Sequence, residues 1–204
     1  SNIISDVQLM MPYMGKEYGG YFIPEIDDHV VVVFLGDHHT MPVIMGSIVP
    51  ADSKFYKEYI KDLQKYKVMK TKGGNLIKIE EEDKKQKMII QTAAKQQLIL
   101  DDENQKIILG DKEANNQLEI NIEDGSFQIE SQKAIKIVCG SSQLHFKKDG
   151  SIEMKGKKIK IEGTELQIKG QQKIDLEGQQ LSIDGKMSTK MKCGSQCEVS
   201  SSGV

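Results

Sequence analysis

The chain has 204 residues, which is enough for one or two domains. Its 28 basic and 30 acidic residues nearly cancel, so a net charge of −2 excludes an overall field that would attract nucleic acid or an anionic membrane surface. The longest apolar run, residues 30–35, is far too short to span a bilayer, and no signal-peptide pattern opens the sequence.

The first fifty residues predict short strands that form a small antiparallel barrel, or part of one. The runs DVQLMM (6–11), HVVVVF (29–34) and MPVIMGSIV (41–49) are rich in β-branched and other apolar residues and are separated by turn residues. The polar stretch LGDHHTMP (35–42) predicts a hairpin loop between the last two strands. We expect the first domain to cover residues 1–50.

Residues 51–67 predict a linker that contains a short helix. Phe55, Tyr59 and Leu63 follow one another at four-residue steps, and this spacing places them on one face of a helix.

Residues 68–204 consist of short alternating runs that end in turn residues. Between residues 156 and 185, glycine recurs at intervals of seven, seven, eight and seven, and the pattern apolar–x–apolar–x–Gly precedes each of the last four glycines. Looser copies lie upstream, at 75–83, 86–92, 96–103, 105–111, 117–125, 126–131, 134–140, 143–150 and 151–156. An apolar period of two that breaks every seven or eight residues predicts strands rather than helices.

Each of these strands has one apolar face and one charged face. Ile159 and Ile161 point to one side, for example, and the lysines beside them point to the other. The glycine at the end of each repeat supplies a corner that a Cβ atom would obstruct. We expect corner glycines at Gly156, Gly163, Gly170, Gly178 and Gly185. The residues expected in the core are Ile135, Ile137, Ile152, Met154, Ile159, Ile161, Leu166, Ile168, Ile174, Leu176, Leu181 and Ile183.

One repeat is too small to fold alone. Burying one of its two apolar side chains contributes roughly 1.5–3 kcal/mol, whereas ordering the backbone costs on the order of 1–2 kcal/mol per residue. The apolar face must therefore close on itself or on copies of itself. A single-chain β-solenoid and an intertwined triple β-helix, which takes one strand from each of three chains per layer, both meet this need.

No cluster of residues predicts catalysis, a cofactor or a metal site. His38 and His39 lie in the expected hairpin loop, and alternation places His145 opposite Leu144 and Phe146. Cys139, Cys193 and Cys197 are favoured as small buried hydrophobic residues, although three cysteines from three chains on an axis stay an alternative. The serines near the C-terminus have no histidine or acid nearby in sequence, so no nucleophile is expected.

Three stretches of the sequence resemble one known family. Residues 10–48 contain Pro12, Tyr13, Gly15, Gly19, Gly20, Phe22, Ile23, Pro24, Glu25, Val30, Val32, Phe34, Gly36, Pro42, Val43, Gly46 and Ser47, and these residues resemble the OB-fold domain of VgrG. VgrG is the spike of the type VI secretion system, and the same domain occurs in phage baseplate central spikes. Residues 68–83 and 137–163 are similar to the entry and the body of the family's β-helix. The family's large hub region is not part of this sequence, so we expect a fragment or an unusually short spike. There is no HxH pair near the C-terminus to suggest an axial iron site.

The resemblance implies an all-β fold in which a partial OB-fold barrel precedes an intertwined trimeric triple-stranded β-helix. It also implies a homotrimeric membrane-puncturing spike that rides on an Hcp-like tube protein, carries a PAAR-type cap and effector cargo, and crosses a target membrane transiently. Such a spike is assembled in the bacterial cytoplasm and then injected, and it is not an enzyme. The cap-binding tip is expected at Val199, Ser200, Ser201, Ser202, Gly203 and Val204.

Two other functions stay open from the sequence. A spike of a phage tail or of an extracellular contractile particle would use the same two domains. A fibre-type glycan-binding adhesin belongs to a different class and would need exposed aromatic residues along the shaft. Beyond residue 68 the aromatic residues are Phe127 and Phe146, and both occupy apolar positions of their strands.

Overall fold

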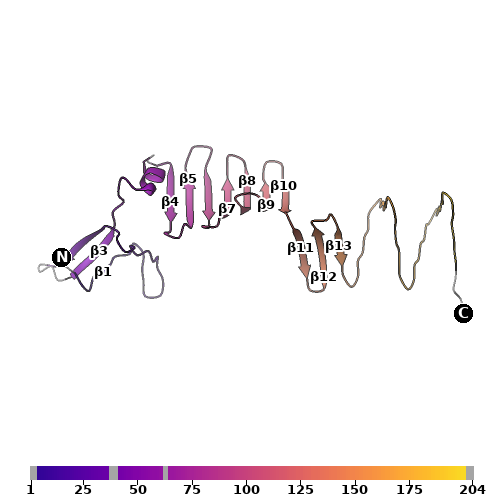
Figure 1. Cartoon of the computed structure of the whole chain (residues 1–204), viewed down its shortest axis with the longest axis horizontal. Helices are drawn as coiled ribbons and strands as arrows, with labels where there is room; N and C mark the ends of the chain where they lie inside the picture. The colour runs from indigo at the N-terminus through magenta and orange to yellow at the C-terminus, as the bar shows by residue number, and fades with distance from the viewer. Residues whose placement is uncertain (1–3, 37–40, 62–63, 201–204) are drawn as a thin grey trace. The chain divides into compact units, whose positions relative to one another are not determined.

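The computed structural model describes residues 4–36, 41–61 and 64–200, and nearly all of its regular structure is β (Figure 1). An all-β fold is therefore confirmed. Contacts within the chain divide it into two units, Ser1–Lys157 and Lys158–Val204. The expected domains at 1–50, 51–67 and 68–204 stay a prediction.

The N-terminal segment forms a three-stranded sheet with the order β1-β3-β2. Its strands are β1 (Gln8–Leu9), β2 (Val30–Leu35) and β3 (Met41–Ser47). β1 and β3 lie inside the runs predicted as strands, and β2 extends one residue beyond the run 29–34. β2 and β3 are antiparallel, with a register shift between Val31 and Val32. β1 is parallel to β3, which differs from the antiparallel expectation. The twenty-residue connection from β1 to β2 is long enough to carry the chain across the sheet, so β1 pairs with the far edge of β3.

The linker contains one helical turn, η1 (Tyr56–Ile60), of the wide π type. The Lys61 amide donates to the Tyr56 carbonyl oxygen at 2.9 Å, and Ser53 Oγ accepts a hydrogen bond from the Tyr56 amide at 3.1 Å. Tyr59 is buried, its ring lies 5.2 Å from the Phe55 ring, and burial together with a hydrogen bond to Glu58 raises the pKa of Tyr59 to about 12. Leu63, the third member of the expected apolar face, lies outside the described residues.

Seven consecutive strands form one antiparallel sheet in which every strand pairs with its neighbours in sequence. They are β4 (Tyr66–Lys70), β5 (Leu76–Glu80), β6 (Lys87–Gln91), β7 (Gln96–Asp101), β8 (Lys106–Asp111), β9 (Asn116–Asn121) and β10 (Ser126–Ser131). The sequence predicts an intertwined β-helix from residue 68 onward, in which successive strands of a layer come from different chains. In this sheet, successive strands of the same chain pair with one another. Short turns explain the difference, because residues with positive φ, such as Lys95 (68°) and Gln105 (49°), reverse the chain at once.

A second antiparallel sheet contains β11 (Ala134–Cys139), β12 (Ser142–Lys147) and β13 (Ile152–Lys155), in sequence order. Its two turns contain Gly140, with a φ of 55°, and Gly150, with a φ of 84°. Both values lie in the left-handed region that glycine adopts without steric cost.

The unit Lys158–Val204 forms no strand ladder within its described part, which ends at residue 200. The chain runs as extended segments, and Figure 1 shows them as a zigzag at its yellow end. Bends fall at 164–165, 171–172, 179 and 186–187, directly after Gly163, Gly170, Gly178 and Gly185. Extended backbone in this unit therefore has no hydrogen-bonded neighbour from the same unit in the described residues.

Candidate functional site: an apolar sheet face

The sheet β4–β10 has one face whose two central rows are almost entirely apolar, beside an outer polar row that includes Gln96, Asp111, Asn116 and Ser131. Its register aligns two rows of side chains that run across all seven strands, and alternation places both rows on the same face. One row is Lys67, Ile79, Met88, Leu100, Ile107, Ile120 and Phe127; the other is Met69, Ile77, Ile90, Leu98, Leu109, Leu118 and Ile129. Lys67, on the first strand, is the single charged residue of the two rows.

Within its own unit, no described part of the chain covers this apolar face. Leu109 keeps 55% of its surface exposed and Phe127 keeps 61%, although both lie inside the rows. A sheet that is apolar on one face is stable when another layer buries that face. The described part of this unit supplies no such layer, so the apolar rows stay exposed.

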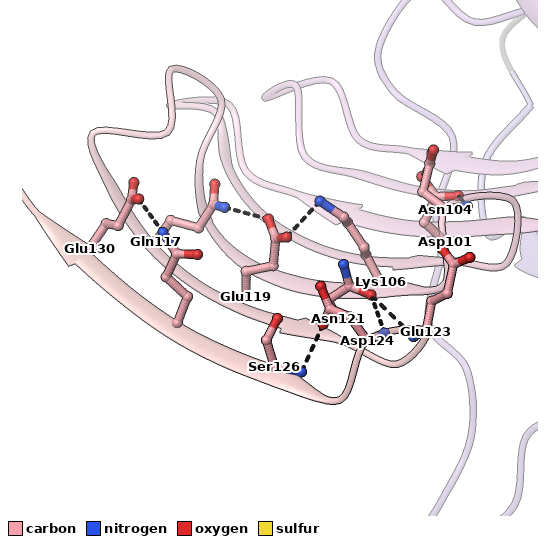
Figure 2. Close-up of polar contacts among 11 residues, drawn as sticks. Asp101, Asn104, Lys106, Gln117, Glu119, Asn121, Glu123, Asp124, Ser126 and Glu130 are labelled. Atoms are coloured by element: carbon pink, nitrogen blue, oxygen red, sulfur yellow. Dashed lines mark hydrogen bonds and ion pairs between the residues drawn. The ribbon is translucent and has the colours of Figure 1, made fainter.

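The opposite face carries ion pairs and amide contacts across the strands. Lys87 Nζ lies 2.7 Å from Asp101 Oδ2, and the Gln91 amide donates to Gln97 Oε1 at 3.1 Å. Figure 2 shows this face over β8–β10, where Glu119 Oε1 lies 2.6 Å from Lys106 Nζ. Three isoleucines also lie on this face in one central row between the polar side chains: Ile89, Ile99 and Ile108. Because it carries these charged and amide side chains, this face is better suited to contact with water than the apolar face.

Asp101 is the one charged residue that is buried among the described side chains, with 7% of its surface exposed. Burial raises the pKa of this carboxyl, but the hydrogen bonds from Lys87 and from the Asn104 side chain and backbone outweigh it and hold the pKa below its ordinary value. The Asn104 amide nitrogen donates to Asp101 Oδ1 at 3.1 Å, and Asn104 Nδ2 donates to Oδ2 at 3.0 Å. The carboxylate thus fixes both the β7–β8 turn and the Lys87 side chain of β6.

The sheet β11–β13 brings four of the expected core residues to one face. Ile135 and Ile152 both pair with Phe146, and Ile137 and Met154 both pair with Leu144. His145 pairs with Lys136 and Glu153, so it lies on the opposite face, as alternation predicts. Ile137, Ile152 and Met154 are exposed in the single chain. The smaller sheet therefore also has an apolar face that the described residues of its unit leave uncovered.

The eight expected core residues of the second unit are all exposed in the single chain. Their exposed fractions run from 48% at Ile159 to 69% at Ile168, and the set is Ile159, Ile161, Leu166, Ile168, Ile174, Leu176, Leu181 and Ile183. The described chain brings no partner over them, so a core at these positions requires other chains and stays a prediction.

The corner glycines differ in the space that is available for a Cβ atom. A Cβ atom at Gly170 would overlap the carbonyl oxygen of Lys173, and one at Gly185 would lie 2.8 Å from the Ser188 oxygen. At Gly163 the nearest atom would be the Glu165 oxygen at 3.2 Å, whereas at Gly178 the Gln180 oxygen would be at an ordinary 3.4 Å. Two of these corners therefore exclude any side chain.

The other positions considered from the sequence do not come together as a site. Cys139, Cys193 and Cys197 are free and exposed in the single chain rather than buried. Of the tip candidates, Val199 and Ser200 are exposed, while Ser201, Ser202, Gly203 and Val204 lie outside the described residues, as do His38 and His39. Across 4–36, 41–61 and 64–200, no three His, Cys, Asp or Glu side chains gather as metal ligands. In those same ranges no helix is long and apolar enough to span a bilayer.

Sequence reasoning missed the apolar rows of β4–β10 as a site. The signal was present, because these strands alternate with the same period of two as the strands from Ile135 onward. What was lacking was the register, which aligns the apolar positions of seven strands into two continuous rows.

Comparison with known proteins connects the N-terminal segment to injection machinery. Residues 3–48 match the family described as the type VI secretion system/phage-baseplate injector OB domain. No curated protein matches the chain. The family match spans the three-stranded sheet β1-β3-β2 and supports a relationship between this chain and the spike proteins of phage baseplates and type VI secretion systems.

Proposed function

We propose that three copies of this chain assemble into a structural spike of a contractile injection machine. The observation that carries the proposal is the continuous apolar face of β4–β10, which the chain itself leaves exposed. The match of residues 3–48 to an injector OB domain supports the same role.

Three copies offer a simple way to cover these faces. Three equivalent sheets around a three-fold axis turn their apolar faces inward and their polar faces, with Lys87–Asp101 and Lys106–Glu119, outward to water. Burying the exposed part of each apolar side chain contributes on the order of 1 kcal/mol, and the rows supply many such side chains.

In the proposed trimer, the extended segments of the second unit pair with segments of the other chains. Its extended segments have no strand partners of their own, and buried backbone N–H and C=O groups must be hydrogen-bonded. In the trimer the segments of the other two chains supply these partners. Residues 158–200 then form the intertwined β-helix, with Ile159 to Ile183 around the axis and the corner glycines at its edges.

The role of such an assembly is mechanical. In a VgrG-like spike, an Hcp-like tube protein carries the trimer, a PAAR-type protein caps its end near Val199, and effectors travel with it through the target membrane. The chain performs this role without catalysis and without a cofactor. It assembles in the bacterial cytoplasm and leaves the cell when the machine contracts. A phage tail or an extracellular contractile particle is a second setting, because the matched family covers injectors of both kinds.

The test replaces Ile168 by aspartate in cells that carry the complete injection machine. Three carboxylates would then meet near one axis without partners, and burying them is strongly unfavourable. We expect loss of the oligomer and loss of injection into target cells. Gln167→Asp, at the adjacent position on the opposite side of the strand, serves as the matched control and should keep both. Normal injection by the Ile168→Asp variant would refute the proposed spike.

A further inference from the structure

A pocket of about 240 Å³ lies between the helical turn η1 and the polar face of strands β4, β5 and β6. Tyr59, Leu76 and Ile89 supply its apolar lining, and Tyr59 is buried. The Tyr59 ring meets the Tyr66 ring edge-on, with 6.2 Å between their centres, and this contact packs η1 against β4. Because pockets for drug-sized ligands have volumes of roughly 300–1,000 Å³, this pocket suits a small ligand.

Three lysines from separate elements line the pocket: Lys70 at the end of β4, Lys78 in β5 and Lys95 in the turn between β6 and β7. Lys70 Nζ lies 3.6 Å from Oε2 of Glu58, the one acidic residue of the lining. Lys78 Nζ lies 2.5 Å from Oε1 of Glu80, which is outside the lining. Among the described side chains, Lys95 pairs with no carboxylate. The ammonium groups at the pocket therefore outnumber the carboxylates by three to two, and an anion would relieve their mutual repulsion.

Each ammonium group is held in place by a contact of its own. Lys70 Nζ lies 5.4 Å from the centre of the Tyr59 ring, within the range of a cation–π interaction. Lys95 Nζ donates to Gln91 Oε1 at 3.2 Å, and Gln91 Nε2 donates in turn to Gln97 Oε1 at 3.1 Å. The third ammonium group is held by its ion pair in β5. A ligand therefore meets charges that are already ordered, which lowers the entropic cost of binding.

The chemistry of the donors selects the ligand. An ammonium group donates hydrogen bonds and accepts none, so three of them require an anion with several acceptor atoms. A phosphate monoester presents three terminal oxygens and about two negative charges, whereas a carboxylate presents two oxygens and one charge. We propose that this pocket binds a phosphate monoester, with Lys70, Lys78 and Lys95 around the phosphate group and the organic part against Leu76 and Ile89.

The test is calorimetric titration of the full chain with phenyl phosphate at pH 8 and low salt. We expect one site per chain and clearly weaker binding of benzoate, which has the same ring but a single carboxylate. Lys70→Gln and Lys95→Gln should each weaken binding about tenfold, the loss expected for one charge-assisted hydrogen bond. Lys84→Gln is the matched control and should bind as the unmodified chain does. Lys84 is also an exposed turn lysine with positive φ, 59° against 68° at Lys95, and it lies outside the pocket lining.

A second arm of the experiment separates a soluble ester from a lipid headgroup. It replaces phenyl phosphate by phosphatidylcholine vesicles with and without phosphatidic acid, which carries a phosphate monoester. Binding of either ester that Lys95→Gln weakens and Lys84→Gln does not supports the site.

Three results would overturn the site: binding of neither ester, benzoate bound as tightly as phenyl phosphate, or equal losses in Lys84→Gln and Lys95→Gln. Circular dichroism of each variant checks that its sheet is intact, so that a loss of binding reports on the pocket. All the residues involved belong to the unit Ser1–Lys157 of one chain, so the result does not depend on the proposed trimer.

Discussion

At the scale of single residues, Asp101 offers a test of the polar face. Its pKa is lowered in the folded chain, so the carboxylate contributes stability above its unfolded pKa of about 3.9, and this contribution is lost as the pH falls through the lower folded value. Asp101→Asn removes the ion pair with Lys87 and should lower the free energy of unfolding at pH 7 by about 1–3 kcal/mol. Urea unfolding at pH 7 and at pH 2.5 measures the difference.

The difference between Asp101→Asn and the unmodified chain should shrink at the lower pH, because the stabilising contribution of the carboxylate is lost as the pH falls through its lowered folded pKa. A difference of the same size at both pH values would show that the charge of Asp101 is irrelevant to stability.

Two of the corner glycines form a matched pair for a second test. A Cβ atom at Gly170 overlaps the Lys173 carbonyl oxygen, while one at Gly178 meets the Gln180 oxygen at 3.4 Å. Gly170→Ala should therefore destabilise the chain's assembled form by about 1–3 kcal/mol, and Gly178→Ala should leave it nearly unchanged. Thermal melting of both variants checks this, and equal melting temperatures would mean that the corners tolerate side chains alike.

At the scale of elements, neighbouring residues of strand β10 lie on opposite faces of the large sheet and allow the two faces to be compared. Ile129 lies in an apolar row, and Gln128 lies on the polar face beside Glu119 and Glu130. Ile129→Lys would place a charge from every chain in the dry interior, whereas Gln128→Lys would place it in water next to carboxylates. We expect the first variant to sediment as a single chain and the second to sediment as the unmodified protein does. An oligomer of Ile129→Lys would mean that the apolar face is not the interface.

The location of the strands was predictable from the sequence, but their pairing was only partly so. Each run from 75–83 to 151–156 coincides with one strand, with β9 and β12 starting one residue earlier, because alternation and turn residues act locally. Whether a strand pairs within its own chain depends on the turn that follows it. The turn at Lys95 requires a positive φ, a backbone conformation that a lysine in the sequence does not predict.

The N-terminal sheet shows the same limit. β1 has two residues, and its parallel pairing with β3 depends on a long connection rather than on a local pattern. For the candidate site, alternation was enough to place Ile135, Ile137, Ile152 and Met154 on one face. The larger face of β4–β10 needed the register of all seven strands, which no single repeat contains.

At the scale of the whole molecule, both units of a single chain leave apolar side chains exposed to water. The strands of the first unit are hydrogen-bonded to one another in sheets, but the apolar faces of these sheets are exposed. The described part of the second unit leaves both its apolar side chains and its extended backbone without partners. In the proposed trimer, association with identical chains would bury these side chains and supply partners for this backbone, since the same surfaces then recur around one axis.

The mass of the unmodified chain in solution tests this account most directly. Size-exclusion chromatography with light scattering should give about 69 kDa, three times the 22.9 kDa of one chain, and the value should persist on dilution. A stable species of 22.9 kDa that remains folded would contradict the trimer, because a lone chain would then tolerate its apolar face in water.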